Sequence, residues 1–219
     1  YVADVGAGTG RYTRLLHQEG ARVHASEPSA AFEVLKRNTR DLDRVEYLKA
    51  PAKDMPLGLF DLVFCVGVLQ FIPEPEEALH AMGRALRPGG ELFLWVYGQE
   101  NNELYLALIR PLRAITTRLP HKILDELAAG LARIAGVYAW ICAASNLHLP
   151  LSNYMRSYFS RLDFYSRKLV VYDQLNPKLA RYYRQEELRT LLEHCGYINI
   201  RMHHRLNYSW SVLARYGEA

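Results

Sequence analysis

Apolar positions along the first hundred residues follow two different spacings. Short runs rich in valine and leucine alternate with segments in which apolar side chains recur every third or fourth position. The first spacing is typical of β-strands and the second of amphipathic helices. The predicted strands are 2–5, 21–26, 45–48, 60–66 and 91–98, and the helices between them begin near Arg11, Ala30 and Glu76. Strands that alternate with helices in this way predict an α/β domain with a parallel sheet.

The pattern changes after residue 98 and returns near residue 184. Between these points we predict two helical stretches, from Leu104 to Thr117 with an interruption at Pro111, and from Lys122 to Ala144. The last predicted elements are a helix and two strands, at 184–196, 198–203 and 208–214.

These changes predict three parts. Residues 1–98 form a core, 99–183 a helical insert, and 184–219 the C-terminal elements that complete the core sheet. The chain begins inside a predicted strand without an initiating methionine, so we interpret it as a fragment.

A glycine-rich loop follows the first strand. Gly6, Gly8 and Gly10 stand at alternate positions, and glycine permits both positive φ and the close approach of a ligand to the backbone. Dinucleotide-binding enzymes prefer G-x-G-x-x-G, whereas here the third glycine comes one residue early. Asp4 precedes the loop, and its carboxylate favours a ligand with ammonium and sulfonium groups over an anionic pyrophosphate.

The loop and three later stretches resemble one family. Residues 4–10, with the sequence DVGAGTG, resemble motif I of the class I methyltransferases that depend on S-adenosylmethionine (SAM). The stretches 60–66 and 67–73 resemble motif IV and the loop after it, and 86–92 (LRPGGEL) is also typical of the family. The resemblance implies a Rossmann-like fold, with a mostly parallel seven-stranded sheet, an antiparallel last strand and here a helical insert. It implies SAM as the cofactor, with Asp4 and the three glycines around its methionine half.

Further cofactor contacts follow from the second strand and the third loop. Glu27 lies at the end of the second strand, where nucleotide-binding folds place an acid for the ribose hydroxyls; capping of the next helix is its alternative role. In the family the loop at 50–56 meets the adenine, often through an acid at the position held here by Pro51. We therefore expect Ala52, through its backbone, or Asp54 to contact the adenine.

The acceptor side is less defined. Val66 and Gln70 are expected to line the methyl side of the cofactor, although a solvated loop amide is an equal alternative for Gln70. In the insert, Tyr172, Asp173 and Asn176 are expected to contact the substrate, with an ordinary Asn-Pro turn as the alternative.

No general base is identifiable from the sequence, so the catalytic residue stays unassigned. The histidines considered for this role lie in predicted helices, in the insert or on the penultimate strand: His17, His80, His121, His148, His203 and His204.

Composition limits the classes of function. With 219 residues, half of them hydrophobic, the chain can bury a sizeable core. Cys65, Cys142 and Cys195 show neither a metal-ligand spacing nor a disulfide framework, so we expect no metal and a reduced, cytoplasmic environment. Nucleic acid is not the expected acceptor, because the chain has no dense basic stripe and its motif IV lacks the Asn/Asp-Pro-Pro-aromatic signature.

The insert holds the positive excess of the chain. Residues 99–183 contain eleven Lys and Arg residues and six Asp and Glu residues, an excess of five positive charges. We favour a lid over a small acceptor; a membrane-surface element for a lipid-linked acceptor comes second, and a homo-oligomer contact is the third interpretation. Arg133 breaks the longest apolar run, so no membrane-spanning segment is expected.

Together these features predict a methyltransferase that moves a methyl group from SAM to a small or lipid-like acceptor, with oxygen as the expected acceptor atom. A SAM-binding protein without catalysis is the main alternative. A nicotinamide-dependent oxidoreductase is disfavoured by the glycine spacing.

Overall fold

The computed structural model describes residues 1–145 and 149–217. The chain separates into two compact units. The core unit takes the described residues of Tyr1–Tyr97, Tyr183–His203 and Trp210–Ala219, and the helical unit takes those of Gly98–Tyr182 and His204–Ser209.

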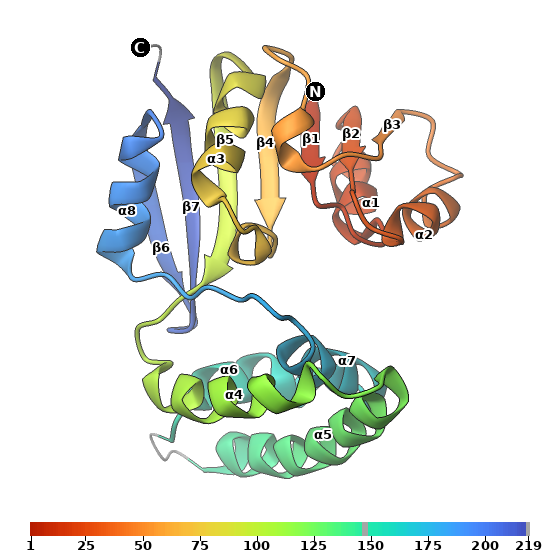
Figure 1. The fold of residues 1–219 in the computed structure, drawn as a ribbon, viewed down its shortest axis with the longest axis vertical. Coiled ribbons are helices and arrows are strands. Elements are labelled where there is room, and N and C mark those ends of the chain that lie inside the picture. Colours follow the sequence, from red (N-terminus) through yellow and green to blue (C-terminus); the bar gives the residue numbers. More distant parts are fainter. Residues whose placement is uncertain (146–148, 218–219) are drawn as a thin grey trace. The chain divides into compact units, whose positions relative to one another are not determined.

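A seven-stranded sheet forms the centre of the core unit, in the order β3-β2-β1-β4-β5-β7-β6 (Figure 1). The strands are Val2–Val5 (β1), Val23–Ser26 (β2), Val45–Leu48 (β3), Phe60–Val66 (β4), Leu86–Tyr97 (β5), Tyr197–Arg205 (β6) and Ser209–Tyr216 (β7). Strands β1 to β5 pair in parallel, and the arrow of β7 in Figure 1 runs against those of β4 and β5. The predicted α/β fold with a mostly parallel sheet is confirmed.

Four helices belong to the core unit. They are Arg11–Gln18 (α1), Ala31–Asn38 (α2), Pro75–Ala85 (α3) and Gln185–His194 (α8), with short 3-10 turns at Ala52–Asp54 (η1) and Leu69–Phe71 (η2). Helix α3 begins with a proline, whose missing N–H would have no partner in a first turn, and Gly196 takes a φ of 85° directly after α8.

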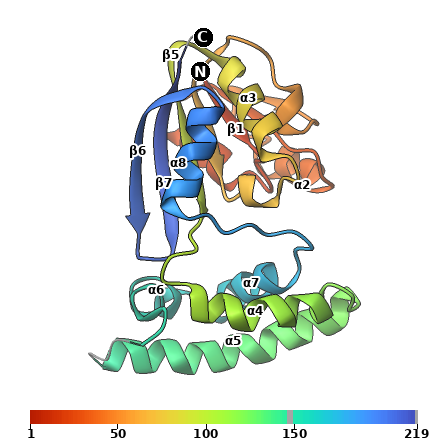
Figure 2. The same ribbon diagram turned by 60° about the vertical axis from the view of Figure 1, so that its left-hand side comes forward.

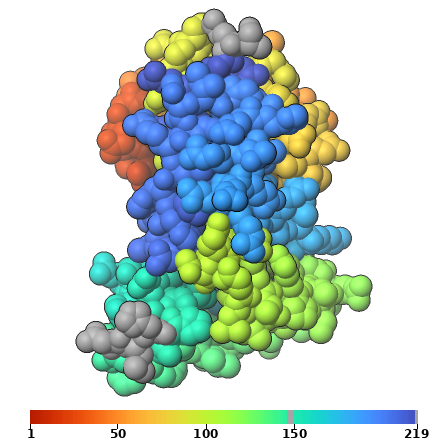
Figure 3. All heavy atoms as spheres, turned by 90° about the vertical axis from the view of Figure 1, so that its left-hand side faces the viewer, coloured from red at the N-terminus to blue at the C-terminus, as the bar shows by residue number. Residues whose placement is uncertain are grey.

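The main core lies between the sheet and helices α3 and α8. Fully buried leucines of these helices, such as Leu79 and Leu188, pack with Val63 of β4 and Leu94 of β5. In the space-filling view of Figure 3, the C-terminal residues coloured blue form the surface of the core unit at the β6 side. The packing explains why the apolar run at β4 is continuous, since a central strand is covered on both faces.

The start of β5 differs from the prediction. The predicted strand begins at residue 91, which leaves Arg87–Gly90 as a turn before it, but Leu86 already pairs with Phe60 of β4, so the strand begins directly after α3. A register shift follows before Glu91 pairs with Leu62, and Gly89 takes a φ of 79° inside it. The turn residues are thus an irregularity within the strand.

The helical unit contains Glu103–Thr116 (α4), His121–Ala144 (α5), Ser152–Ser157 (α6) and Phe164–Leu175 (α7), with a 3-10 turn at Phe159–Arg161 (η3). Helix α5 packs against α6 and α7. The expected interruption at Pro111 is wrong, since α4 runs through it. The proline removes the hydrogen bond to the carbonyl of Ala107, and because Ala107 is exposed, water can solvate that carbonyl.

Part of the basic excess of the insert serves the ends of its own helices. Arg113 donates from Nε to the carbonyl of Gln174 at 2.9 Å, at the end of α7. Arg156 donates to the carbonyls of Cys142 and Ser145 at 2.9 and 2.8 Å, at the end of α5. Cations at these positions satisfy orphan carbonyls and oppose the negative end of the helix dipole.

Helix α5 is also the one helix, among the described residues, that is long and apolar enough to cross a membrane by length and composition. Its most apolar window has a mean hydropathy of 1.6, and 22% of that window is buried within the protein. The expectation that Arg133 excludes such a segment is therefore wrong on these two criteria.

Candidate cofactor and acceptor site

The candidate cofactor residues meet at the carboxyl ends of the central strands. Strand β1 lies between β2 and β4, which is the point where the strand order reverses. Ligands of open α/β sheets bind in the crevice outside the strands at this point. Asp4 lies in β1 directly before the glycine loop, Glu27 follows β2, and Gly67 follows β4.

Asp4 is a buried carboxylate. Its side chain is 2% exposed, and the hydroxyl of Thr13 in α1 donates to its Oδ2 at 2.6 Å. Burial raises the pKa of Asp4 to about 6, and the negative charge of Glu27 adds to this effect. None of the ion pairs in the described residues involves Asp4. A buried carboxylate without a cationic partner is costly, so this position is suited to a positively charged ligand.

Glu27 links the glycine loop to the loop after β2. Its Oε2 accepts from the N–H of Gly8 and its Oε1 from the N–H of Ser29, each at 2.9 Å. Ser29 itself accepts from the N–H of Ala31 at the start of α2. Because an ionised carboxylate offers about four acceptor positions, Glu27 retains capacity for two ribose hydroxyls.

The three glycines of the loop differ in their surroundings, although each has a positive φ. A Cβ on Gly6 would lie 2.5 Å from Val68, and one on Gly10 would lie 2.8 Å from Thr39, so both are packed against the chain itself. A Cβ on Gly8 would meet nothing closer than the Gly6 carbonyl oxygen, at 4.0 Å. Gly8 is therefore the glycine of this loop that has space for a ligand.

The predicted adenine loop is placed beside β2. Ser26 donates to the carbonyl of Ala50 at 3.0 Å, which holds the loop at the end of that strand. Ala52 is 7% exposed and its side chain belongs to the core, whereas Asp54 is exposed. Their contact with an adenine stays a prediction.

Gln70 lies in η2, after β4, and is completely buried. The solvated loop amide considered from the sequence is therefore wrong. Neither amide atom of Gln70 has a hydrogen-bond partner in the part of the chain that the structure describes. A Cβ built on Gly67 would lie 3.8 Å from Nε2 of Gln70 and 3.7 Å from the Trp95 ring. The amide and this ring therefore border the same place beside Gly67. Val66, the last residue of β4, is half-buried.

Beside Gln70 lies an aromatic cluster of Phe71, Trp95 and Tyr97, which was not predicted from the sequence. The rings of Trp95 and Tyr97 meet edge to face with centroids 5.3 Å apart, and Phe71 contacts Tyr97 at 6.1 Å. All three side chains are half-buried. The signal was present, because Phe93, Trp95 and Tyr97 stand at alternate positions and so project from one face of β5.

Tyr172 and Asp173 lie in the last turns of α7, and Asn176 follows that helix directly. The Tyr172 hydroxyl lies 2.6 Å from Nδ1 of His121, which joins α7 to α5. Asp173 and Asn176 are exposed. All three residues belong to the helical unit and the cofactor residues to the core unit, so their contact with a substrate stays a prediction.

Residues 3–94 match the family model described as "Methyltransferase domain". The matched range contains the glycine loop, Asp4, Glu27 and the strand β4, which together form the site described above. The core unit of this chain thus contains a methyltransferase domain, and its fold is that of the class I SAM-dependent methyltransferases. The methyl donor of this family is SAM, as predicted from the sequence.

Curated relatives of the methyltransferase domain include two enzymes of Erwinia tasmaniensis. The ubiquinone biosynthesis O-methyltransferase is 26% identical over 113 residues, which covers 49% of this chain and 46% of the relative. The ubiquinone/menaquinone biosynthesis C-methyltransferase is 27% identical over 156 residues, which covers 67% of this chain and 59% of the relative. The chain thus spans about half the length of these relatives.

Solved structures show the same fold. The 1,6-didemethyltoxoflavin-N1-methyltransferase of Burkholderia thailandensis, with bound substrate and S-adenosylhomocysteine, matches with a TM-score of 0.57 at 15% identity. The match covers 99% of this chain and 71% of that one.

The methyltransferase domain has no assigned general base. No group of three or more His, Cys, Asp and Glu side chains in the described residues could hold a metal ion. His203 is exposed on β6 and His17 contacts Asp43 at 2.8 Å, while His148 lies outside the described residues.

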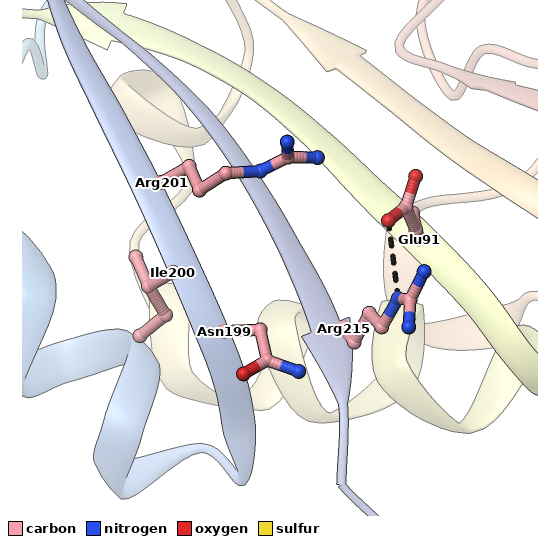
Figure 4. A pocket seen from close by; sticks show the side chains of 5 residues that line it. All are labelled: Glu91, Asn199, Ile200, Arg201 and Arg215. Atoms are coloured by element: carbon pink, nitrogen blue, oxygen red, sulfur yellow. Dashed lines mark hydrogen bonds and ion pairs between the residues drawn. The ribbon is translucent and has the colours of Figure 1, made fainter.

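A cavity of about 510 Å³ lies elsewhere in the methyltransferase domain (Figure 4). It is lined by Glu91, Asn199, Ile200, Arg201 and Arg215, and Arg215 pairs with Glu91 at 3.1 Å. Glu91 is near the start of β5, at the edge of the sheet opposite to the carboxyl ends of the parallel strands. This cavity is therefore separate from the candidate cofactor residues.

Proposed function

We propose that this chain is an enzyme that transfers a methyl group from SAM to a small aromatic acceptor of the quinol or phenol type, at oxygen. The observation that carries the proposal is the buried carboxylate of Asp4, which forms no ion pair among the described residues, near a glycine loop with open space at Gly8. Two of the relatives support the acceptor class, since both are named for quinone biosynthesis.

The cofactor residues have distinct roles in this proposal. When bound, SAM supplies a methyl group on a positively charged sulfur. Asp4 attracts the positive charge of the ligand, Gly8 lets it lie against the backbone, and Glu27 accepts hydrogen bonds from the ribose. Because Glu27 already holds the N–H of Gly8, it also shapes the loop that receives the cofactor.

The acceptor residues favour a flat ring with one polar edge. Trp95, Tyr97 and Phe71 offer aromatic surface for an apolar ring, and such pairs contribute about 0.5–1.5 kcal/mol beyond area burial. Gln70 is enclosed beside Trp95, and its amide can donate and accept a hydrogen bond only with a ligand that reaches this enclosed space. This combination suits a hydroxylated ring better than a charged or purely aliphatic acceptor.

The proposed acceptor atom is the oxygen of an aromatic hydroxyl. An aromatic hydroxyl loses its proton more readily than an aliphatic one, so it depends less on a strong base. Orientation of two bound reactants can itself supply roughly 7–11 kcal/mol. One of the relatives is named an O-methyltransferase and the other a C-methyltransferase, so the test must identify the methylated atom.

Calorimetric titration with SAM, S-adenosylhomocysteine and NAD, followed by methyl transfer from labelled SAM to catechols and hydroquinones, tests this proposal. We expect the two adenosyl compounds to bind, NAD not to bind, and a labelled methoxy product that mass spectrometry and NMR can locate. Binding of SAM without transfer to any ring would support a SAM-binding protein without catalysis. Binding of NAD alone would refute the cofactor assignment.

Replacement of Gln70 with leucine is expected to stabilise the fold and impair acceptor turnover. Leucine has a similar volume and removes two buried polar atoms that lack partners among the described residues, each of which costs about 1–3 kcal/mol. We expect a higher melting temperature, unchanged SAM affinity and about a tenfold lower kcat/KM for the acceptor. Lower stability together with unchanged turnover would show that the amide has an internal structural role.

A further inference from the structure

Helix α5 presents an apolar face to solvent. Ile134 is 67% exposed, Val137 60%, Trp140 69% and Ile141 40%, and Ala144 is exposed in the last turn. These five residues, which we call the α5 face, recur at helical spacing on one side of the helix. Figure 2 shows α5 as the longest helix of the helical unit.

The α5 face is not needed for the packing of the helical unit. The opposite side of the helix carries its buried residues, among them Leu124, Ala128 and Cys142, and packs against α6 and α7. A surface helix normally has one apolar stripe directed to the core and a polar side directed to water. Helix α5 has a second apolar stripe, and patches of this kind mark sites of interaction.

The charges near this face are positive. From residue 127 to the end of α5 at Ala144 the sequence contains no Asp or Glu, and its one charged residue is Arg133. Arg133 and Lys122 are exposed on α5, along the side where Trp140 projects. Arg133 lies over the ring of Phe164, which is 45% exposed, with its guanidinium 4.8 Å from the ring centroid. The surface therefore combines apolar side chains, a tryptophan and the cations Arg133 and Lys122, while the exposed carboxylate on this side of α5, Glu126, lies one turn from Lys122 and outside the α5 face.

We propose that the α5 face docks on the surface of a membrane that contains anionic lipids. An apolar helix face with Lys and Arg beside it binds in the plane of the interface, where tryptophan is favoured at the level of the headgroups. Arg133 and Lys122 reach lipid phosphates, while Ile134, Val137 and Ile141 enter the acyl boundary. Because the other side of α5 is packed within the protein, the helix lies on the membrane and does not cross it.

Positive charge favours lipid over a second copy of the chain as the occupant. Two α5 faces in contact would bring together two copies of the stretch 127–144, which carries Arg133 and no carboxylate, whereas anionic headgroups complement both Arg133 and Lys122. This proposal does not depend on the identity of the acceptor, and failure of one leaves the other unaffected.

Sedimentation with vesicles tests the proposal. The intact chain is expected to bind vesicles of phosphatidylglycerol and phosphatidylcholine and to bind pure phosphatidylcholine at least tenfold more weakly, with the difference reduced by high salt. Trp140→Glu is expected to lower binding about tenfold or more, since it places a negative charge at the interface. Leu57→Glu is the matched control, because Leu57 is 66% exposed on the core unit, and its binding should be unchanged.

Two further measurements keep the proposal open to refutation. Brominated lipids should quench tryptophan fluorescence in the natural chain and not in Trp140→Phe, since the remaining tryptophans lie in the core unit. Light scattering without lipid should give a monomer for both the natural chain and Trp140→Glu. A dimer that Trp140→Glu dissociates would show that the α5 face joins two copies, and equal binding of both vesicle types would refute the electrostatic argument.

Discussion

Asp4→Asn is expected to raise the thermal stability of the protein and to lower its affinity for SAM about a hundredfold. The pKa of Asp4 is about 6 in the folded chain, against an ordinary value of 3.8, because the carboxyl is buried. Above about pH 6 Asp4 is ionised in both states, and its ionisation costs more free energy in the folded state than in the unfolded state. The difference is about 3 kcal/mol of folding free energy, which asparagine would recover while still accepting the Thr13 hydrogen bond.

The pH dependence fixes the sign of this effect. Below about pH 4 Asp4 is protonated in both states, so the stability gain of Asp4→Asn should vanish there and reach its maximum above about pH 6. SAM affinity of the natural chain should fall as the pH drops through 6, because a protonated Asp4 no longer attracts a cation. Melting temperatures between about pH 3 and 8 measure the first trend, and calorimetric titrations between about pH 5 and 8 measure the second.

Asp41→Asn provides the control for Asp4→Asn. Asp41 is an exposed carboxylate whose pKa is lowered to about 2 by its hydrogen bonds with Arg14. Its replacement should leave SAM affinity unchanged and should not raise stability. If Asp4→Asn instead lowered stability and left SAM binding intact, Asp4 would serve the fold through Thr13 and the charge argument would be refuted.

The sequence was sufficient for features that depend on neighbouring residues. The strands at 2–5, 45–48 and 60–66 match the structure because their apolar runs are short and bounded by turn residues. The glycine loop and the acid at Glu27 occupy the carboxyl ends of β1 and β2, as the order of strand, loop and helix requires. Local pattern therefore determined the family and the candidate cofactor residues.

Burial of polar side chains could not be predicted, because it depends on what packs over them. Gln70 stands in a loop segment of ordinary composition, yet it is completely enclosed in the core unit. Thr13 shows no distinctive pattern in α1, but the fold places its hydroxyl on Asp4. The packing around Gly6 and Gly10 could not be predicted either, because their neighbours Val68 and Thr39 come from distant parts of the chain.

Helix ends in the insert were also beyond local pattern. No helix was predicted between Ala144 and residue 184, but α7 runs from Phe164 to Leu175. Arg113 and Thr116 of α4 satisfy the last carbonyls of α7, at Gln174 and Leu175. These tertiary contacts stabilise the last turn of the helix, and a propensity argument does not include them.

Gly8→Ala is expected to reduce SAM affinity about a hundredfold while costing little stability. Gly8 has a φ of 56° and open space where a Cβ would stand, so a methyl group there would occupy the surface on which the ligand lies. A hundredfold loss corresponds to about 2.7 kcal/mol of binding free energy. The left-handed backbone adds a strain of roughly 1–2 kcal/mol for alanine, which should lower the melting temperature by a few degrees.

Gly58→Ala separates this strain from the loss of the cofactor surface. Gly58 has a φ of 64° and nothing within 4 Å of the place where the alanine methyl group would stand. It precedes β4, so it lies at the amino ends of the parallel strands, away from the cofactor residues at their carboxyl ends. Both variants should therefore lose a similar amount of thermal stability, because alanine meets the same backbone conformation in each. Only Gly8→Ala should lose affinity for SAM and S-adenosylhomocysteine in calorimetric titration. Equal affinities in the two variants would mean that the ligand does not lie against Gly8, and the placement of the cofactor on this loop would be wrong.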